Sequence, residues 1–266
     1  YNGQGDSRTP FRTSAVGLIV NIILDPLLIY GIGPFPAWGT AGAAVATALA
    51  QLVVYGIFAR RIFSDRFPLG RMHLLNRLKQ DYARRIILLG LPVSIQNALF
   101  SMFSLTLATL AARWGAVGVA AQSIGAQIEA ISWMTAAGFS TALAAFTGQN
   151  YGAGNLTRCR QATKWCLLLG IGLGEAFSLL LVAFGLGFAG LYTTDGAIAL
   201  LALTRMKWIL PFEGFNTIIE ILSGTLRGLG YSLVPTILCA AFICGLRILW
   251  IKLIFPLSPT FLGLLL

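Results

Sequence analysis

The organisation of this chain follows from the stretch Gly228-Leu229-Gly230-Tyr231-Ser232-Leu233-Val234-Pro235, because its frame occurs twice. The earlier copy is Gly3-Gln4-Gly5-Asp6-Ser7-Arg8-Thr9-Pro10, with the same Gly-x-Gly-x-Ser-x-x-Pro pattern. Each copy leads directly into a long apolar run, residues 11–30 and residues 236–255. So short a pattern would also recur by chance, but its shared place before an apolar run favours duplication. A repeat of such a long period predicts two duplicated halves rather than a solenoid of short units.

The composition places the chain in a membrane. Hydrophobic residues make up 57% of its 266 positions and charged residues only 11%, with a mean hydropathy of +0.80. A soluble domain has about 25% charged residues, so this chain could not cover its own surface in water. Its apolar runs have the length of roughly 20 residues that a helix needs to cross the hydrocarbon core. We therefore expect an all-α integral membrane protein, and the net charge of +10 belongs to its loops rather than to a nucleic-acid surface.

We expect seven membrane-spanning helices and the beginning of an eighth. In order they cover residues 11–30, 39–58, 86–112, 117–146, 165–191, 199–222 and 234–255, and the eighth begins near Pro256. The Gly- and Asn-rich residues 148–155 predict a turn after the fourth span. Residues 59–85 hold eight of the 19 basic residues, and Leu74, Leu75 and Leu78 predict a surface-lying amphipathic helix there. The expected domains are the last two helices of an N-terminal lobe (1–58), a basic linker (59–85) and a C-terminal lobe (86–266).

Charged residues in the connections predict the orientation. Arg8 and Arg12, the linker, Arg158 to Lys164, and Arg227 fall on alternate connections, which the positive-inside rule places in the cytoplasm. Both copies of the repeat then begin spans that enter from the same side, so the halves are parallel. The first span pairs with the seventh, and we expect four more spans before Tyr1 and twelve in the complete protein.

Asp25 is the first candidate functional residue, because an ionisable side chain inside a span costs about 2.5–3.5 kcal/mol on insertion scales. Asn21 lies one helical turn earlier on the same face, and Pro26 frees a backbone carbonyl there. A carboxylate, an amide oxygen and a free carbonyl suit either a hard cation or a proton relay. The structural alternative is an Asp that bends the helix and is hydrogen-bonded by its neighbours.

The sixth expected span carries a polar stripe with helical spacing, formed by Glu213, Asn216, Thr217 and Glu220. Such a stripe must face protein or water rather than lipid. It predicts either a counter-charge for a bound cation or a structural ion pair with a basic residue, for which the candidates are Arg205, Lys207 and Arg247. Further candidates for the substrate cavity are Glu129, Glu175 and Asn97; for Asn97, hydrogen bonding between helices is the alternative.

Four stretches carry a family resemblance: residues 21–31 (NIILDPLLIYG), 39–47 (GTAGAAVAT), 147–155 (TGQNYGAGN) and 223–230 (SGTLRGLG). In this order they resemble the multidrug and toxic compound extrusion (MATE) transporters, over essentially the whole chain. The resemblance implies helices five to eleven, and part of twelve, of two six-helix lobes related by a pseudo-two-fold axis. It further implies a secondary active antiporter that exports amphipathic, mostly cationic organic compounds in exchange for protons or sodium ions by alternating access.

The same resemblance assigns roles to single residues. In the family, the Asn-x-x-x-Asp pair, here Asn21 and Asp25, belongs to the cation or proton site of the first lobe. We add Thr47 as a further candidate, a hydroxyl facing the same cavity. Sodium at Asp25 and Asn21 is one implied occupant. In the NorM-type branch an Asp stands where this chain has Asn216, and a Glu stands near the place of Phe100. Both departures weigh against a NorM-like sodium site in the second lobe.

Two other classes compete with this interpretation. An enzyme would need a nucleophile–base or metal constellation, but the single histidine, His73, lies in the linker. A flippase for lipid-linked saccharides on a similar two-lobe plan would place several cations in the cavity, whereas Arg247 is the only one deep in an expected span. We therefore expect a cofactor-free, monomeric transporter of the bacterial inner membrane that meets organic cations and membrane lipids and no nucleic acid, with its basic linker in the cytoplasm.

Overall fold

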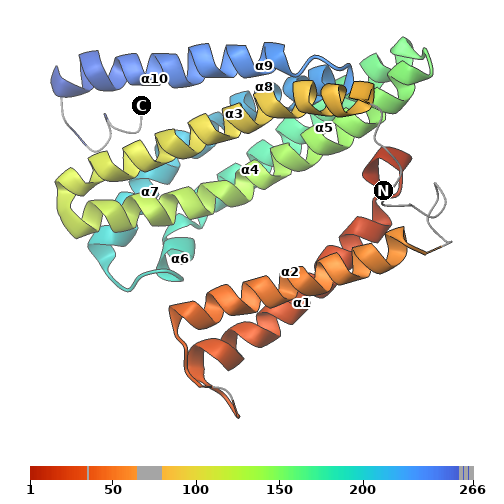
Figure 1. Ribbon diagram of the computed structural model, residues 1–266. Helices are drawn as coiled ribbons and strands as arrows, with labels where there is room; N and C mark the ends of the chain where they lie inside the picture. The colour runs from red at the N-terminus through yellow and green to blue at the C-terminus, as the bar shows by residue number, and fades with distance from the viewer. Residues whose placement is uncertain (35, 65–79, 258–259, 261–262, 264–266) are drawn as a thin grey trace. The chain divides into compact units, whose positions relative to one another are not determined.

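The computed structural model describes residues 1–34, 36–64, 80–257, 260 and 263, and the regular structure of these residues is entirely helical (Figure 1). The expected all-α fold class is confirmed. Backbone contacts divide the chain into two compact units, Tyr1–Lys79 and Gln80–Leu266. The amphipathic helix expected around Leu74, Leu75 and Leu78 lies outside the described residues.

The first unit is a helical hairpin of α1 (Arg8–Tyr30) and α2 (Thr40–Ile62) (Figure 1). Its turn begins at Gly31, whose φ of +71° is left-handed and therefore favours glycine. Gly42 of α2 lies directly against the backbone carbonyl of Leu28, so closely that any Cβ at this position would collide with it. Small residues allow such close helix packing in lipid, where packing rather than the hydrophobic effect drives association.

The second unit consists of long helices packed around α4. Its helices are α3 (Gln80–Ala111), α4 (Gly115–Gly152), α5 (Leu156–Ala183), α6 (Gly185–Gly190), α7 (Gly196–Ile209), α8 (Glu213–Gly228), α9 (Leu233–Leu238) and α10 (Leu246–Leu249). Two π-helical stretches, Cys239–Gly245 and Trp250–Ile254, join and extend the last two helices into one rod (Figure 1). α4 packs against α5, α7 and α8, which makes it the centre of this unit.

α8 approaches α4 through two glycines. A Cβ at Gly224 would lie 2.5 Å from the carbonyl oxygen of Ser140, and one at Gly228 would lie 2.6 Å from that of Ala144. The Ser140 hydroxyl also donates a 2.8 Å hydrogen bond to the backbone carbonyl of Glu220. The two helices are therefore in backbone contact over two turns, and the polar stripe of α8 is fixed against α4.

The two copies of the repeat have the same local backbone. The second glycine of each copy is left-handed, with φ of +81° at Gly5 and +92° at Gly230. The serine two positions later is the N-cap in both copies, Ser7 for α1 and Ser232 for α9. The proline of each copy is then the third residue of its helix, within the first turn, where a missing backbone N–H costs no hydrogen bond.

Three expectations about the spans are corrected. Residues 148–152 continue α4 rather than forming a turn, since Thr147 and Asn150 are buried in the packing and the turn is confined to residues 153–155. The fifth span begins at Leu156 and ends at Ala183, earlier than expected. The sixth is broken into α7 and α8 by the 3-10 turn Leu210–Phe212, because Pro211 cannot donate the backbone hydrogen bond of a continuous helix.

Five helical segments among the described residues are long and apolar enough to cross a membrane. They are Arg8–Tyr30, Thr40–Ile62, Ala83–Gly152, Leu156–Ala183 and Leu233–Leu257. The third contains both α3 and α4, so it accounts for two of the expected spans. The chain is thus a multi-pass membrane protein.

The close contact at Gly42 gives a testable prediction. Gly42→Ala places a methyl group against backbone that cannot move aside, so we expect the hairpin to be destabilised by about 1–3 kcal/mol. Gly56→Ala on the same helix meets nothing within 4 Å, and should leave stability unchanged or slightly raised. Thermal unfolding of the two variants in detergent measures the difference. Equal melting temperatures would contradict the close packing of α1 and α2.

Candidate functional site

Asn21 connects the two helices of the first unit through polar side chains. Its Nδ2 lies 3.4 Å from Oδ1 of Asp25 on α1 and 3.5 Å from the hydroxyl oxygen of Thr47 on α2. Both distances are long for hydrogen bonds, so the contacts are weak. Thr47 in turn donates a 2.9 Å hydrogen bond to the carbonyl of Ala43. The three residues expected to couple ion movement therefore lie together, with Asn21 and Asp25 half-buried and Thr47 exposed.

The chemistry of this group fits a hard cation and a proton equally well. Pro26 has no N–H to offer the carbonyl of Ile22, so a backbone oxygen is available beside the carboxylate, the amide and the hydroxyl. Carboxylate, carbonyl and hydroxyl oxygens are the ligands of hard cations, and a single carboxyl group can also take a proton. Among the described residues no group of three or more His, Cys, Asp or Glu could hold a metal ion. A cation here would thus depend on neutral oxygen ligands as well as Asp25.

A buried ion pair lies at the centre of the second unit. Arg205 of α7, 6% exposed, donates from Nε to Oε1 of Glu129 on α4 at 2.7 Å and from Nη2 to Oε2 of the same carboxylate. Its remaining amino group donates to Oε1 of Gln122, which lies about two helical turns before Glu129 on the same face of α4. Gly125 makes this possible, since a Cβ there would lie 2.5 Å from Cδ of Arg205. Arg205 and Glu129 therefore neutralise each other at the closely packed interface between α4 and α7.

The carboxylates near the start of α8 have other partners. Glu213, which is buried, accepts a 2.8 Å hydrogen bond from Nδ2 of Asn216 on its own helix. Glu175 of α5 accepts a 2.9 Å hydrogen bond from the backbone N–H of Gly214, in the first turn of α8 where the helix dipole favours an anion. The described residues contain no ion pair between Glu213 or Glu220 and Arg205, Lys207 or Arg247. The structural ion pair considered for the stripe is thus formed by Glu129 instead.

Two other sequence candidates have different surroundings. Glu220 is half-buried, and its backbone carbonyl rather than its side chain receives the bond from Ser140. Asn97 is exposed and makes no hydrogen bond among the described residues, whereas its neighbour Gln96 is buried. Oε1 of Gln96 accepts from Thr236 at 3.4 Å and from Arg227 at 3.3 Å. Gln96 therefore fills the helix-bridging role considered for Asn97.

Sequence reasoning found most members of these groups but not their pairing. Glu129 and Arg205 were both named, yet they are far apart in the chain and only the packing of α4 on α7 joins them. Sequence reasoning missed Gln96 and Gln122 as hydrogen-bond acceptors for Arg227 and Arg205. The one signal in the sequence that could have indicated them is an amide side chain inside an apolar run. Arg247 lies with its guanidinium carbon 5.1 Å from the ring centre of Phe103, a cation–π contact that no spacing indicated.

The buried pair predicts a non-additive response to mutation. Arg205→Gln leaves the Glu129 carboxylate buried without its partner, and we expect a loss of about 3–5 kcal/mol of stability. The double variant Glu129→Gln/Arg205→Gln removes both charges and should recover most of that loss. The melting temperatures of the single and double variants in detergent give the coupling free energy. Losses that simply add would show that the pair is not closely coupled.

Helices long enough to span a membrane, with carboxylate, amide and guanidinium groups turned into their bundle, are the architecture of a transporter. Comparison with known proteins specifies which kind. Residues 92–251 match the MatE family model, and the chain belongs to this family. The family consists of transporters and not of enzymes.

Relatives and solved structures agree with this assignment. The chain is 31% identical over 237 residues to a probable multidrug resistance protein NorM of Thermotoga maritima, covering 89% of this chain and 51% of that protein. It is 30% identical over 192 residues to an FAD transporter of Shewanella oneidensis, covering 72% of this chain and 42% of that protein. It also superposes with a TM-score of 0.84 and 24% identity on an outward-facing multidrug resistance MATE transporter, covering 99% and 58% of the two chains. The chain spans about half the length of the curated relatives it matches.

Proposed function

We propose that this chain is part of a multidrug efflux antiporter, which exports amphipathic, mostly cationic organic compounds in exchange for protons or sodium ions. The observation that carries the proposal is the contact of Asp25, Asn21 and Thr47 across two membrane helices. A carboxylate inside a span is costly and is therefore a candidate functional residue, and here it lies among oxygen ligands that suit a proton or a hard cation. Relatives described as multidrug resistance proteins support the export direction.

The charges of the second unit support cationic substrates. Arg205 and Glu129 neutralise each other, which leaves Glu175, Glu213 and Glu220 as carboxylates without an ion pair among the described residues. An organic cation inside the bundle would gain from these carboxylates, and aromatic faces would add cation–π attraction. In this proposal Glu213, Asn216 and Glu220 contribute to the substrate cavity.

The two compact units are assigned to two lobes. The hairpin of α1 and α2 contributes to the N-terminal lobe, and α3 to α10 form most of the C-terminal lobe, with residues 59–85 as the linker. Alternating access then comes from relative motion of the lobes. The basic connections face the cytoplasm by the positive-inside rule, and the protein works as a monomer in the bacterial inner membrane.

A flippase for lipid-linked saccharides receives less support. Its pyrophosphate would need free cations in the bundle, but Arg205 is paired with Glu129 and Arg247 packs over Phe103. Because one relative is described as an FAD transporter, an anionic nucleotide is a better alternative substrate to test against organic cations than a lipid-linked saccharide.

Transport by the full-length protein in vesicles tests the proposal, with sodium and pH gradients imposed separately. A cationic dye, FAD and a lipid-linked saccharide serve as the three substrates. We expect the dye to be exported under one of the two gradients, and the other substrates to move slowly or not at all. Dye export that neither gradient drives would overturn the antiporter mechanism, and preferred movement of FAD or the saccharide would overturn the cationic substrate class.

Asp25→Asn should separate coupling from binding. The amide has the shape of a protonated carboxyl group but cannot release a proton or attract a cation, so gradient-driven export should fall at least about 10-fold. Dye binding, measured by fluorescence polarisation, should remain. Asp81→Asn is the matched control, because Asp81 is exposed in the first turn of α3. Normal export by the Asp25 variant would move the coupling role to Glu213 or Glu220.

A further inference from the structure

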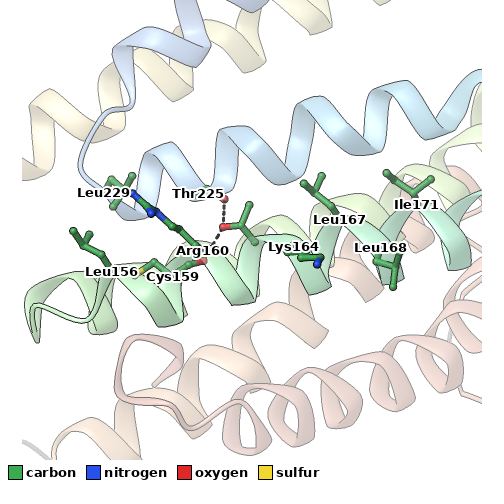
Figure 2. Close-up of a pocket in the computed structure, with 10 residues that line it drawn as sticks. Leu156, Cys159, Arg160, Lys164, Leu167, Leu168, Ile171, Thr225 and Leu229 are labelled. Carbon is green, nitrogen blue, oxygen red and sulfur yellow. Dashed lines mark hydrogen bonds between the residues drawn. The ribbon is translucent and has the colours of Figure 1, made fainter.

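A pocket of about 700 Å³ lies between α5 and the C-terminal end of α8 (Figure 2). Most of its lining comes from the first half of α5, and Thr225 and Leu229 form the wall across from it. The hydroxyls of Thr163 and Thr225 lie 3.2 Å apart and link the two helices at the pocket. None of the candidate coupling or cavity residues lines this pocket, so it is a separate feature of the second unit.

The pocket carries two cations and no acid in its lining. Arg160 and Lys164 lie one helical turn apart on α5, and both side chains are exposed. Among the described residues neither makes a hydrogen bond, an ion pair or a ring contact. Arg158 on the same helix differs, because its guanidinium carbon lies 5.8 Å from the ring centre of Phe146. Arg160 and Lys164, the fifth and ninth residues of α5, therefore present uncompensated positive charge at one end of the pocket.

Beyond Lys164 the α5 wall of the pocket is apolar. Leu167, Leu168 and Ile171 line it one to two turns beyond Lys164. At a rise of about 1.5 Å per residue, Arg160 and Ile171 are separated by about 16 Å along the axis. This is about half of the 30 Å thickness of the hydrocarbon core. α5 is itself apolar enough to cross a membrane, and Leu168 is 62% exposed on it.

We propose that this pocket binds one anionic phospholipid. The phosphate lies at Arg160 and Lys164, and an acyl chain lies along Leu167, Leu168 and Ile171. A soluble phosphate would occupy only the basic end and would leave the apolar wall uncovered, whereas a phospholipid matches both the charge and the length. The proposal depends on the membrane location of the helices and not on the export of drugs.

The test uses the full-length protein in detergent, with phosphatidylglycerol and phosphatidylcholine as probes. Native mass spectrometry measures how much of each lipid remains bound, and thermal unfolding measures the stabilisation. We expect retention of phosphatidylglycerol in preference to phosphatidylcholine. Each cation near an anionic lipid contributes about a five-fold effect on affinity, so Arg160→Gln/Lys164→Gln should weaken phosphatidylglycerol binding roughly 25-fold. Arg158→Gln is the matched control on the same helix and should bind as the unmodified protein does.

A second pair of variants tests the apolar part without changing charge. Leu168→Trp fills the pocket and should lower retention of phosphatidylglycerol, while Leu169→Trp, at an exposed position that does not line the pocket, should not. Unfolding in phosphatidylcholine alone shows whether each variant is folded. Binding by the Arg160/Lys164 variant equal to that of the control would overturn the proposal. Displacement of the lipid by millimolar inorganic phosphate would also overturn it, since the occupant would then be a soluble anion.

Discussion

The backbone contact between α4 and α8 is the constraint on which the second unit depends. Gly224 and Gly228 allow α8 to approach until a Cβ at either position would collide with the backbone carbonyl of Ser140 or Ala144. In lipid there is no hydrophobic gain from bringing two apolar helices together, so close van der Waals contact must supply the association. Because this contact fixes the rotation of α8, the polar face with Glu213 and Asn216 is held inside the bundle rather than exposed to lipid.

The same requirement explains how the bundle accommodates its charges. A lone charge in a low-dielectric interior is costly, and Arg205 avoids this cost by giving its donors to Glu129 and Gln122. Gly125 supplies the space, because the arginine side chain crosses α4 where any other residue would place a Cβ. Glu213 and Glu175 instead use an amide side chain and a helix N-terminus. Within the part of the bundle that the structure describes, Glu129 is thus the one carboxylate in an ion pair, and Glu175, Glu213 and Glu220 have none.

The repeated Gly-x-Gly-x-Ser-x-x-Pro frame has a direct physical meaning. Its second glycine takes a left-handed conformation, its serine stands at the helix N-cap, and its proline falls in the first turn, in both Gly5 to Pro10 and Gly230 to Pro235. The glycine and the proline each stand where that residue type is least costly, while neither serine side chain makes a capping hydrogen bond. The frame is therefore a helix-entry signal used twice, in two units that are each compact by themselves.

The sequence by itself determined the fold class, the two helix entries marked by the repeat, and the placement of Asn21 beside Asp25, whereas Thr47 joins them only through the packing of α2 on α1. Apolar run length and local turn chemistry act over a few residues, and Asn21 and Asp25 are one helical turn apart, so spacing alone places them together. The tertiary structure decided the extension of α4 through residues 148–152, where packing overrides a Gly- and Asn-rich composition. It also decided the partner of Arg205, the place of Gln96 and the pocket at Arg160 and Lys164. These depend on how helices distant in the chain rotate against one another, and that rotation is fixed by side-chain volume at the contacts, which no periodicity in a single sequence records.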